Sequence, residues 1–363
     1  EFFVRWKDCL YGLLKKHGYA VGHAGKFGIW APFPRKSVDF FADEEGWHYK
    51  NINGRQWHIT ERNEYDSIRF LQNRDKTKPF FLNTAFYATH AKDGGKSEQY
   101  YPQNRSMSMY LNVTIPTPVT GTKEAWDNLP DFFEEGNEGR ARWHWRYDTP
   151  NKFQRMMKNY YRMASEVDSA CGAIIEELRR QGELENTLII FTTDNGNFHG
   201  EHGLADKWYP HQESIRVPLI IKDPRMPADK AGMVNEDFTL NLDLAPTILS
   251  AAGVQPPLEM MGRDMSDLYL QEDVNWRTEF LYEHPKHGGH IPASEALVRK
   301  DYKYLFWPDY KLEQLFDIKN DPYEERDIIH SNETDHQHIL KEMRNRYIEL
   351  RETVHDLSKN VTV

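Results

Sequence analysis

The chain has 363 residues and a formal net charge of −10 at neutral pH, with 39% apolar and 28% charged residues. This length allows one large domain, or a large and a small one, with a sizeable buried core. The acidic charge argues against a nucleic-acid partner, because nucleic-acid binders carry a basic surface. No apolar run approaches the roughly 18 residues of a membrane-spanning helix, so we expect no membrane span.

The chain contains two cysteines, Cys9 and Cys171. Two thiols are compatible with one disulfide or with two buried side chains, and they exclude a zinc site built from thiolates. Aromatic residues make up 13% of the chain, including 10 Trp. They suit stacking on sugar rings, but packing in the core is their commoner use and is the interpretation that we favour.

The first part of the chain alternates between a helix and strands. Helical spacing of leucines over residues 4–16, ended by Gly18, predicts a helix with a glycine beyond its C-terminus. The apolar segments 19–25 and 79–86 predict buried strands, and a polar cluster follows each of them. Residues 92–150 are rich in Pro, Gly and Trp and predict a long irregular insertion. Such an insertion in a compact domain is usually a functional surface.

The middle of the chain has the clearest periodicity. An apolar stripe repeats every three or four positions over residues 153–181 and predicts a long helix closed by Gly182. The segments 187–193 and 216–221 are apolar on both faces, as in central strands of a parallel sheet, and a helix follows at 242–253. This alternation predicts an α/β fold with a doubly wound, mostly parallel sheet flanked by helices.

The pattern changes beyond residue 265. Short alternating segments, EFLYEH, EALVRKDYKYLFW and EQLFDI, are separated by turn residues and predict an antiparallel sheet. A polar helix follows over residues 336–357. We therefore expect two domains: an α/β domain over residues 1–265 and a smaller C-terminal α+β subdomain over residues 266–363.

Asp194 and Asn195 come directly after an apolar strand, which is where ligands bind in doubly wound sheets. A carboxylate and an amide oxygen side by side are the ligands that a hard divalent cation such as calcium prefers. The same residues also form helix caps and Asx-turns, and from Asp-Asn-Gly alone that structural role is the stronger interpretation.

Several cationic or titratable side chains also follow predicted strands. His199 and His202 have the spacing of a zinc pair, but the glycines around them argue against the helix that such a pair requires. Lys207 follows shortly, and Lys26 and His90 lie after two earlier strands. Cationic groups from three segments can converge on one tetrahedral anion, although a loop lysine is usually just solvated.

Four short motifs occur in order between residues 193 and 220. They are Thr-Asp-Asn-Gly at 193–196, Gly-Glu-His-Gly at 200–203, Lys207, and Glu-Ser-Ile-Arg-Val-Pro-Leu-Ile at 213–220. This order resembles the late signature of the type I sulfatases of the alkaline-phosphatase superfamily. The passages LLKKHGY, PFFLNTAFYATH, YYRMASEVDSACGAIIEEL, LVRKDYKYL and LEQLFDIKNDPYEERDI are similar to that family too, so the resemblance extends over nearly the whole chain.

The resemblance implies a sulfuric ester hydrolase that contains one Ca²⁺ ion. It implies that Asp194 and Asn195 are ligands of that ion. It also implies that Lys26, His90 and Lys207 are catalytic groups, which bind the sulfate and assist the leaving group. In such a site the ion and the cationic side chains offset the charge that develops on the sulfate oxygens.

We expect the substrate to be a sulfated carbohydrate, contacted by His202, His287 and His290. The expectation of a carbohydrate depends on the aromatic insertion at 92–150 and on the histidine-rich loop EHPKHGGHIP at 283–292. The resemblance further implies a periplasmic or secreted protein.

The sequence departs from the family pattern in two places. Phe27-Gly28 stand where the family has Trp-His, so a histidine that assists the nucleophile is absent from its expected position. The sequence also contains neither the early Asp-Asp pair nor the Cys-x-Pro-x-Arg motif whose cysteine becomes the formylglycine nucleophile, and Cys9 does not fit that motif. We expect these motifs and a central strand to precede Glu1, so that the chain as given has no sulfatase turnover.

Two alternatives stay open at this point. A phosphodiesterase or phosphonate monoester hydrolase of the same superfamily also handles tetrahedral anions with a metal and a lysine. A non-catalytic protein that binds sulfated glycans would keep the pocket without the nucleophile.

Overall fold

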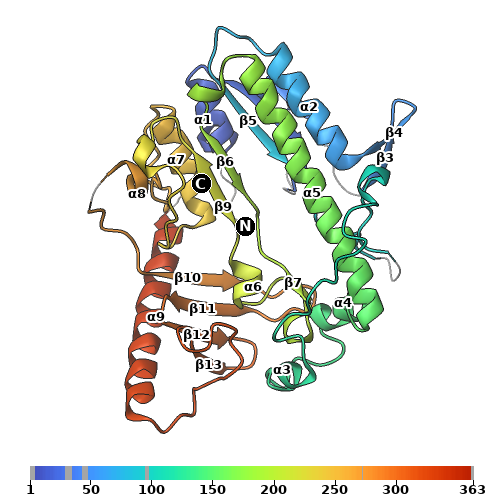
Figure 1. Cartoon of the computed structure of the whole chain (residues 1–363). Helices are drawn as coiled ribbons and strands as arrows, with labels where there is room; N and C mark the ends of the chain where they lie inside the picture. Colours follow the sequence, from blue (N-terminus) through green and yellow to red (C-terminus); the bar gives the residue numbers. More distant parts are fainter. Residues whose placement is uncertain (1–4, 29–34, 43–47, 95–97, 272, 361–363) are drawn as a thin grey trace.

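The structure is a computed structural model that describes residues 5–28, 35–42, 48–94, 98–271 and 273–360, with side chains as far as residue 356. Figure 1 shows an α/β region at one end of the molecule and a four-stranded antiparallel sheet with a long helix at the other. This arrangement confirms the predicted fold class.

A three-stranded parallel sheet lies in the α/β region, in the order β2-β1-β5. Its strands are β1 (Ala20–Gly25), β2 (Phe40–Ala42) and β5 (Phe80–Ala85). β1 is buried along its whole length, whereas β5 is only half-buried. A Cβ atom on Gly22 would come within 2.7 Å of the Phe70 ring, so a glycine at this position lets a helix pack closely on the sheet.

Helices cover both faces of this sheet. α2 (Ile59–Asn73) and α5 (Pro150–Arg180) lie on one face, and α1 (Leu10–Lys16) and α7 (Leu244–Ala251) lie on the other. The core on the α5 side contains Ala20, Phe70, Leu71, Leu178 and Leu184. The core on the α1 side contains Leu14, Val21, Val38, Leu249 and Val254. The sheet with helices on both faces is the doubly wound arrangement that the alternating pattern predicts.

The ends of α5 follow from its sequence. Thr149 caps the N-terminus by accepting a hydrogen bond from the Lys152 N–H, and Pro150 occupies the first helical position, where no N–H is needed. The chain leaves the helix at Gly182, whose φ of +72° suits a glycine. The predicted helix at 153–181 is therefore confirmed.

The predicted central strands at 187–193 and 216–221 differ from expectation. β6 (Ile189–Thr192) and β9 (Leu219–Lys222) pair antiparallel with each other, in a two-stranded sheet of their own within the described residues. Phe191 is 37% exposed and Ile220 is 66% exposed. The prediction of parallel, buried strands was wrong here, because composition indicates how apolar a strand is but not which strand lies beside it.

The predicted irregular region at 92–150 contains two helices, α3 (Lys123–Asp127) and α4 (Glu138–Arg146). Asn137 caps α4 by accepting hydrogen bonds from the N–H groups of Gly139 and Arg140. Both helices are polar and short, so they lack the apolar stripe from which a helix is predicted.

The remaining elements are short connections. They are β3 (Tyr49–Ile52), β4 (Arg55–His58), β7 (Phe198–His199), β8 (Ala205–Asp206), α6 (Gln212–Ile215) and α8 (Asp267–Leu270). Single 3-10 turns occur at Trp6–Asp8, Arg35–Ser37, Asn104–Ser106, Leu184–Asn186, Glu201–Gly203, Ala228–Lys230 and Asn241–Asp243.

The C-terminal part forms the predicted antiparallel sheet, in the order β10-β11-β12-β13. The strands are β10 (Glu279–His284), β11 (Ser294–Arg299), β12 (Tyr302–Trp307) and β13 (Leu312–Asp317), and α9 (Thr334–Asn360) packs on one face. The other face packs on side chains of the α/β region, namely Phe133, Phe198, Leu204 and Tyr209. The two parts share a core, and a domain boundary at residue 265 stays a prediction.

A buried ion pair joins β12 to the α/β region. The Lys303 ammonium binds Glu324 and donates to the Pro210 carbonyl at 2.8 Å, while Glu324 accepts from the Gln212 N–H at 2.7 Å. Neither charged side chain has exposed area. We expect Lys303→Met to lower the free energy of unfolding by about 3–5 kcal/mol, because it leaves a buried, unpaired carboxylate.

Urea denaturation measures this loss. The double variant Lys303→Met with Glu324→Gln should recover much of it, because no unpaired charge remains. Lys300→Met is the matched control, since Lys300 is 52% exposed and pairs with Asp237 at the surface; it should cost less than about 1 kcal/mol. Equal losses for Lys303→Met and Lys300→Met would contradict the assignment.

Candidate functional site

The candidate site begins where β6 ends. Directly beyond it, β7 and β8 form a small antiparallel hairpin whose tip is the 3-10 turn Glu201–Gly203. Gly200 and Gly203 have φ angles of +110° and +67°, a backbone region in which glycine is favoured. These glycines allow the tight turn of the hairpin, so no continuous helix contains both His199 and His202.

Lys207 directly follows this hairpin, and the residue before it, Asp206, is held by two arginines. The Asp206 carboxylate binds Arg146 Nη1 at 2.6 Å and Arg142 Nη1 at 2.5 Å, and it is nearly buried. Burial alone would raise the pKa of Asp206, but the two guanidinium groups outweigh it and lower the pKa below its usual value. Asp206 and Trp208 have φ angles of +68° and +88°, which are uncommon outside glycine. The buried ion pairs hold this backbone, and with it the position of Lys207.

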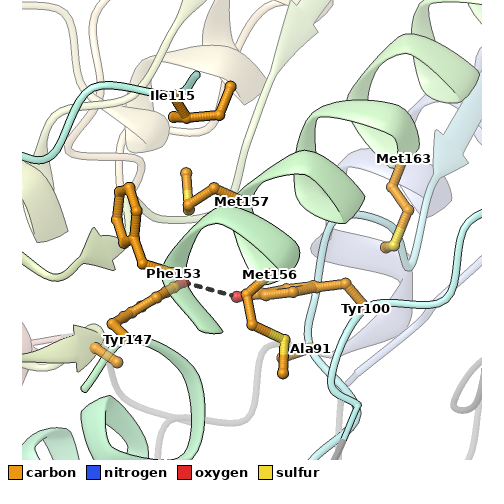
Figure 2. Close-up of a cluster of buried hydrophobic side chains, with 9 residues drawn as sticks. Ala91, Tyr100, Ile115, Tyr147, Phe153, Met156, Met157 and Met163 are labelled. Atoms are coloured by element: carbon orange, nitrogen blue, oxygen red, sulfur yellow. Dashed lines mark hydrogen bonds between the residues drawn. The ribbon is translucent and has the colours of Figure 1, made fainter. Parts of the chain in front are cut away.

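An apolar cluster connects the segments that carry His90 and Lys207. Figure 2 shows this cluster around the start of α5. Its buried members include Ala91, next to His90, and Ala205, two residues before Lys207. The Tyr100 and Tyr147 hydroxyls lie 3.1 Å apart within it. Close packing of this kind fixes the two loops relative to each other.

Lys207 and Lys26 both lie within electrostatic reach of His90. The pKa of the His90 ring is lowered mainly by burial, then by the charge of Lys207 and, more weakly, by that of Lys26. Lys26 directly follows β1, and its N–H donates to the Ala85 carbonyl at the end of β5. No carboxylate of the described residues pairs with Lys26 or Lys207. We call these three predicted catalytic residues the cationic cluster, in which His90 also feels the opposing charge of Asp93.

The two nitrogens of His90 have different surroundings. Nδ1 lies 2.7 Å from the Ala91 carbonyl, so in the neutral ring Nδ1 carries the proton and donates it. Nε2 has no hydrogen-bond partner among the described residues. The His48 ring binds the His90 carbonyl at 2.9 Å and fixes the backbone here. His90 therefore presents Nε2 to any ligand in the cationic cluster.

Asp194 and Asn195 stand at the end of β6, as predicted. The Asn195 N–H donates to Asp194 Oδ1 at 2.9 Å, and Asn195 Nδ2 donates to the Gly196 carbonyl at 2.6 Å. Asn241 Nδ2 holds the Asp194 carbonyl at 2.8 Å. A Cβ atom on Gly196 would lie 2.1 Å from the Glu213 carbonyl oxygen, so this close approach requires glycine.

These two residues fit only part of a calcium site. The Asn195 amide donates through its nitrogen, which leaves its oxygen as a possible ligand beside the exposed Asp194 carboxylate. Ca²⁺ takes about six to eight oxygen ligands. Within the residues that the structure describes, no group of three or more His, Cys, Asp or Glu side chains could hold a metal ion. Asp194 and Asn195 alone therefore do not complete a site.

His202 lies in the interior, away from the cationic cluster. Its ring is 1% exposed and packs 5.0 Å from the His211 ring, next to Phe198. The backbone N–H of His202 donates to the Thr120 carbonyl at 2.9 Å. The ring is not accessible to a ligand in this conformation, so a packing role fits the structure better than the predicted substrate contact. His199 packs elsewhere, 4.4 Å from Tyr160.

His287 and His290 are exposed in the loop between β10 and β11. The base of this loop lies against the residue after Lys207, since Tyr282 Oη and Ser294 Oγ both donate to the Trp208 carbonyl, at 3.1 and 3.4 Å. Among the described residues, no hydrogen bond or ion pair links either histidine to the cationic cluster. The loop is thus near Lys207, and its histidines do not contact the other predicted site residues.

Sequence reasoning missed the residues that support the site. Arg142 and Arg146 hold Asp206, but they lie 64 and 60 positions from it in the sequence. The sequence signal that they offer is their spacing of four on one helix, which places both side chains on one face. Because their partner Asp206 is distant in the sequence, this spacing alone does not predict a site.

Two family models match the chain. One, described as Sulfatase, matches residues 4–254, and another, described as N-sulphoglucosamine sulphohydrolase, C-terminal, matches residues 200–353. The chain belongs to the sulfatase family. This confirms the resemblance that the motifs indicated, and it places Asp194, Lys207 and His90 within the matched residues of the family model. The sulfatase family generally uses a metal ion.

Curated relatives of this chain are sulfatases by name. An arylsulfatase of Clostridium perfringens is 30% identical over 291 residues, which cover 79% of this chain and 56% of the relative. An N-acetylglucosamine-6-O-sulfatase of Bacteroides thetaiotaomicron is 25% identical over 398 residues, which cover 87% of this chain and 68% of the relative. The chain thus spans little more than half the length of the first of these relatives.

Solved structures share the fold. A protein in complex with its substrate D-glucosamine-2-N,6-O-disulfate has a TM-score of 0.78 at 23% identity, covering 97% of this chain and 82% of that protein. A phosphonate monoester hydrolase of Silicibacter pomeroyi has a TM-score of 0.74 at 18% identity, covering 95% of this chain and 79% of that protein. At these identities the likeness concerns the fold, which sulfatases and phosphonate hydrolases share. In the described part of the chain, no helix is long and apolar enough to cross a membrane.

The cationic cluster gives a first prediction about the site. Replacing Lys207 by Gln removes a positive charge that disfavours protonation of His90, so the pKa of His90 should rise. A pH titration of the His90 ring resonances by NMR measures the shift. Lys16→Gln is the control, because it removes the same charge from an exposed position at the end of α1. An unchanged His90 pKa in Lys207→Gln would contradict the proximity of the two groups.

The buried histidines of the hairpin region predict acid lability. Burial lowers the pKa of His202 and of His211 to about 3, helped at His211 by the charge of Lys303 and at His202 by the neighbouring His211 ring. The unfolded chain takes up these protons below about pH 6.5, whereas the folded chain does not. The free energy of unfolding should therefore fall as the pH falls from about 6.5 toward 3, by roughly 2 kcal/mol per histidine between pH 7 and pH 5.

Urea midpoints at pH 7 and pH 5 test this expectation. The variant His211→Asn should lose less stability between the two pH values than the parent protein. His287→Asn, which removes an exposed histidine, should follow the parent. The explanation fails if His211→Asn and the parent have the same pH dependence.

Proposed function

We propose that the protein that carries this chain hydrolyses sulfate esters of a carbohydrate. The observation that supports this most directly is the cationic cluster of Lys26, His90 and Lys207, in a chain of the sulfatase family. Neither of its lysines pairs with a carboxylate of the described residues. Such a cluster neutralises a tetrahedral anion, and electrostatic stabilisation is usually the largest contribution to reactions of this type.

The three cationic side chains take different roles in the proposed site. Lys26 and Lys207 bind sulfate oxygens as point charges. His90 is neutral when the site is empty, because burial and the two lysines lower its pKa. An anion between the lysines cancels their charge and raises the pKa of His90. The ring then takes up a proton at Nε2 and donates a hydrogen bond to the anion or to the leaving oxygen.

We further propose that Asp194 and Asn195 contribute two oxygen ligands to a calcium ion. When bound, such an ion offsets negative charge on the sulfate group. The described residues around them supply too few oxygens for a complete site, so the other ligands come from elsewhere.

The substrate class is proposed from two relatives. One relative is named for sulfate at the 6-O position of N-acetylglucosamine, and one structural neighbour holds a disulfated glucosamine. We propose a sulfated carbohydrate, and a periplasmic or secreted location in line with an extracellular sulfatase homolog of Drosophila melanogaster. A phosphonate monoester hydrolase is the second candidate, because that fold neighbour also handles a tetrahedral anion.

The decisive experiment compares anions on one preparation. We expect the protein to bind inorganic sulfate in calorimetry, and Lys207→Ala to weaken binding at least tenfold by loss of a direct charge. In turnover assays of the full-length protein that carries this chain and a matured nucleophile, release of sulfate from 6-O-sulfated N-acetylglucosamine should exceed hydrolysis of a phenyl phosphonate monoester. Lys207→Ala should lower kcat/KM by about 10²–10³.

Lys16→Ala serves as the matched control, since it removes an exposed lysine at the end of α1 that is not part of the cluster. It should match the parent protein in both assays. Sulfate affinity that is unchanged in Lys207→Ala would remove Lys207 from the site, and a preference for the phosphonate ester would favour the second candidate.

A further inference from the structure

A pocket lies between residues of α3 and α4. Figure 1 shows these helices at the end of the molecule far from α1. The volume of the pocket is about 380 Å³, which falls within the range of about 300–1,000 Å³ typical of small-molecule sites. We call it the tryptophan pocket. Its lining includes Lys123, Trp126, Glu135, Arg140, Trp143 and Gly203. None of these residues belongs to the cationic cluster.

Two indole rings and one guanidinium group form the wall of the tryptophan pocket. The Arg140 guanidinium carbon lies 4.1 Å from the ring centroid of Trp126 and 4.1 Å from that of Trp143. Glu135 accepts from Arg140 Nε and Nη2, each at 3.1 Å, and the Gly203 carbonyl accepts from Nη1 at 3.1 Å. Four residues thus hold the guanidinium through five contacts, so both indoles are ordered before any ligand arrives. Such preorganisation lowers the entropy lost on binding.

The pocket retains polar groups for a ligand. Both indoles are partly exposed, and neither indole N–H donates to an acceptor within the described residues. Glu135 also accepts from the His144 ring, at 2.6 Å, which orients its carboxylate. Indole N–H donors and carboxylate acceptors are suited to hydroxyl groups, and an indole face is suited to an apolar ring face.

The charges of the tryptophan pocket cancel. Lys123 forms an ion pair with Asp127, and Arg140 forms one with Glu135. An anionic group would therefore find no unpaired cation here, in contrast to Lys26 and Lys207. The pocket favours a ligand that is uncharged, rich in hydroxyl groups and apolar on one face. A saccharide unit without sulfate has this chemistry.

The pocket has a fixed position relative to Lys207. Gly203 belongs to both the pocket and the hairpin that precedes Lys207. A Cβ atom on Gly203 would lie 2.6 Å from Arg140 Nη1, so the close contact between hairpin and guanidinium requires glycine. α4 carries the pocket residues Arg140 and Trp143, and its next turn carries Arg146, which binds Asp206. One rigid helix therefore connects the pocket with the turn of Lys207.

We propose that the tryptophan pocket is a saccharide-binding subsite, which takes an uncharged sugar unit of a glycan while the cationic cluster takes the sulfate group of another unit. The assignment to a substrate rests on the proposed function. The binding itself is independent of turnover.

Isothermal titration with unsulfated tetrasaccharides of N-acetylglucosamine and of galactose tests the proposal. We expect at least one of them to bind, and Trp126→Ala and Trp143→Ala each to weaken that binding at least tenfold. Trp145→Ala is the matched control, because Trp145 lies on the same helix, is partly exposed and does not line the pocket. It should bind as the parent protein does.

A second measurement avoids substitution altogether. In protein labelled with ¹⁵N at tryptophan, the indole N–H resonances of Trp126 and Trp143 should shift during the titration, while that of Trp276 should not. Trp276 donates to the Phe238 carbonyl outside the pocket. Absence of binding by both tetrasaccharides, equal affinities of Trp143→Ala and Trp145→Ala, or unshifted resonances of Trp126 and Trp143 would each overturn the subsite.

Sulfate binding in the same preparations separates this inference from the proposed function. Saccharide binding without affinity for inorganic sulfate overturns the function and supports the subsite. Sulfate affinity that depends on Lys207, without saccharide binding, supports the function and overturns the subsite.

Discussion

The site depends on one buried carboxylate. Asp206 sits in a backbone conformation that is uncommon for its type, and it is held there by Arg142 and Arg146 of α4. A buried ion pair of this kind adds little net stability, because the desolvation of the charges offsets most of their attraction. Its loss is nevertheless costly, because one charge would stay buried without a partner. The interaction therefore fixes a geometry, and the geometry that it fixes is the turn that presents Lys207.

The C-terminal sheet supports the same loop from the opposite side. Phe198 and Leu204 of the hairpin are fully buried against side chains of the sheet, among them Trp307. The hairpin is therefore enclosed between α4 and the sheet, and it cannot move without opening a core. His202, beside Leu204, belongs to this packed layer, which explains why a histidine of a functional motif is buried. Some residues of this motif, such as His202, are therefore buried in the packing beneath the candidate site.

The sequence predicted those parts of the fold whose patterns are local. The periodic stripe of α5 and the alternating strands after residue 265 are such patterns, and both are confirmed. The pairing of β6 with β9 was predicted wrongly, since strand neighbours depend on contacts between distant segments. For the site, motif order predicted that Lys26, His90 and Lys207 act together, and in the structure the charges of both lysines lower the pKa of His90. Their catalytic roles stay a prediction. The partners of Asp206 were missed for the same reason as the strand pairing. A contact between residues about sixty positions apart produces no recognisable pattern in a single sequence.

The charge of the chain bears on how the cationic cluster and the tryptophan pocket differ. With a net charge of −10, the protein as a whole repels a polyanionic glycan, so long-range attraction does not guide such a ligand to the surface. Attraction is confined to the cationic cluster, where Lys26 and Lys207 lack carboxylate partners and act over a few ångströms. The tryptophan pocket, in which Arg140 is paired with Glu135, adds contacts to uncharged groups. Salt does not screen such contacts, and the net negative charge does not oppose them. If both proposals hold, the two together would let an acidic protein hold a sulfated chain: the cationic cluster would bind the sulfate, and the indoles would bind the sugar.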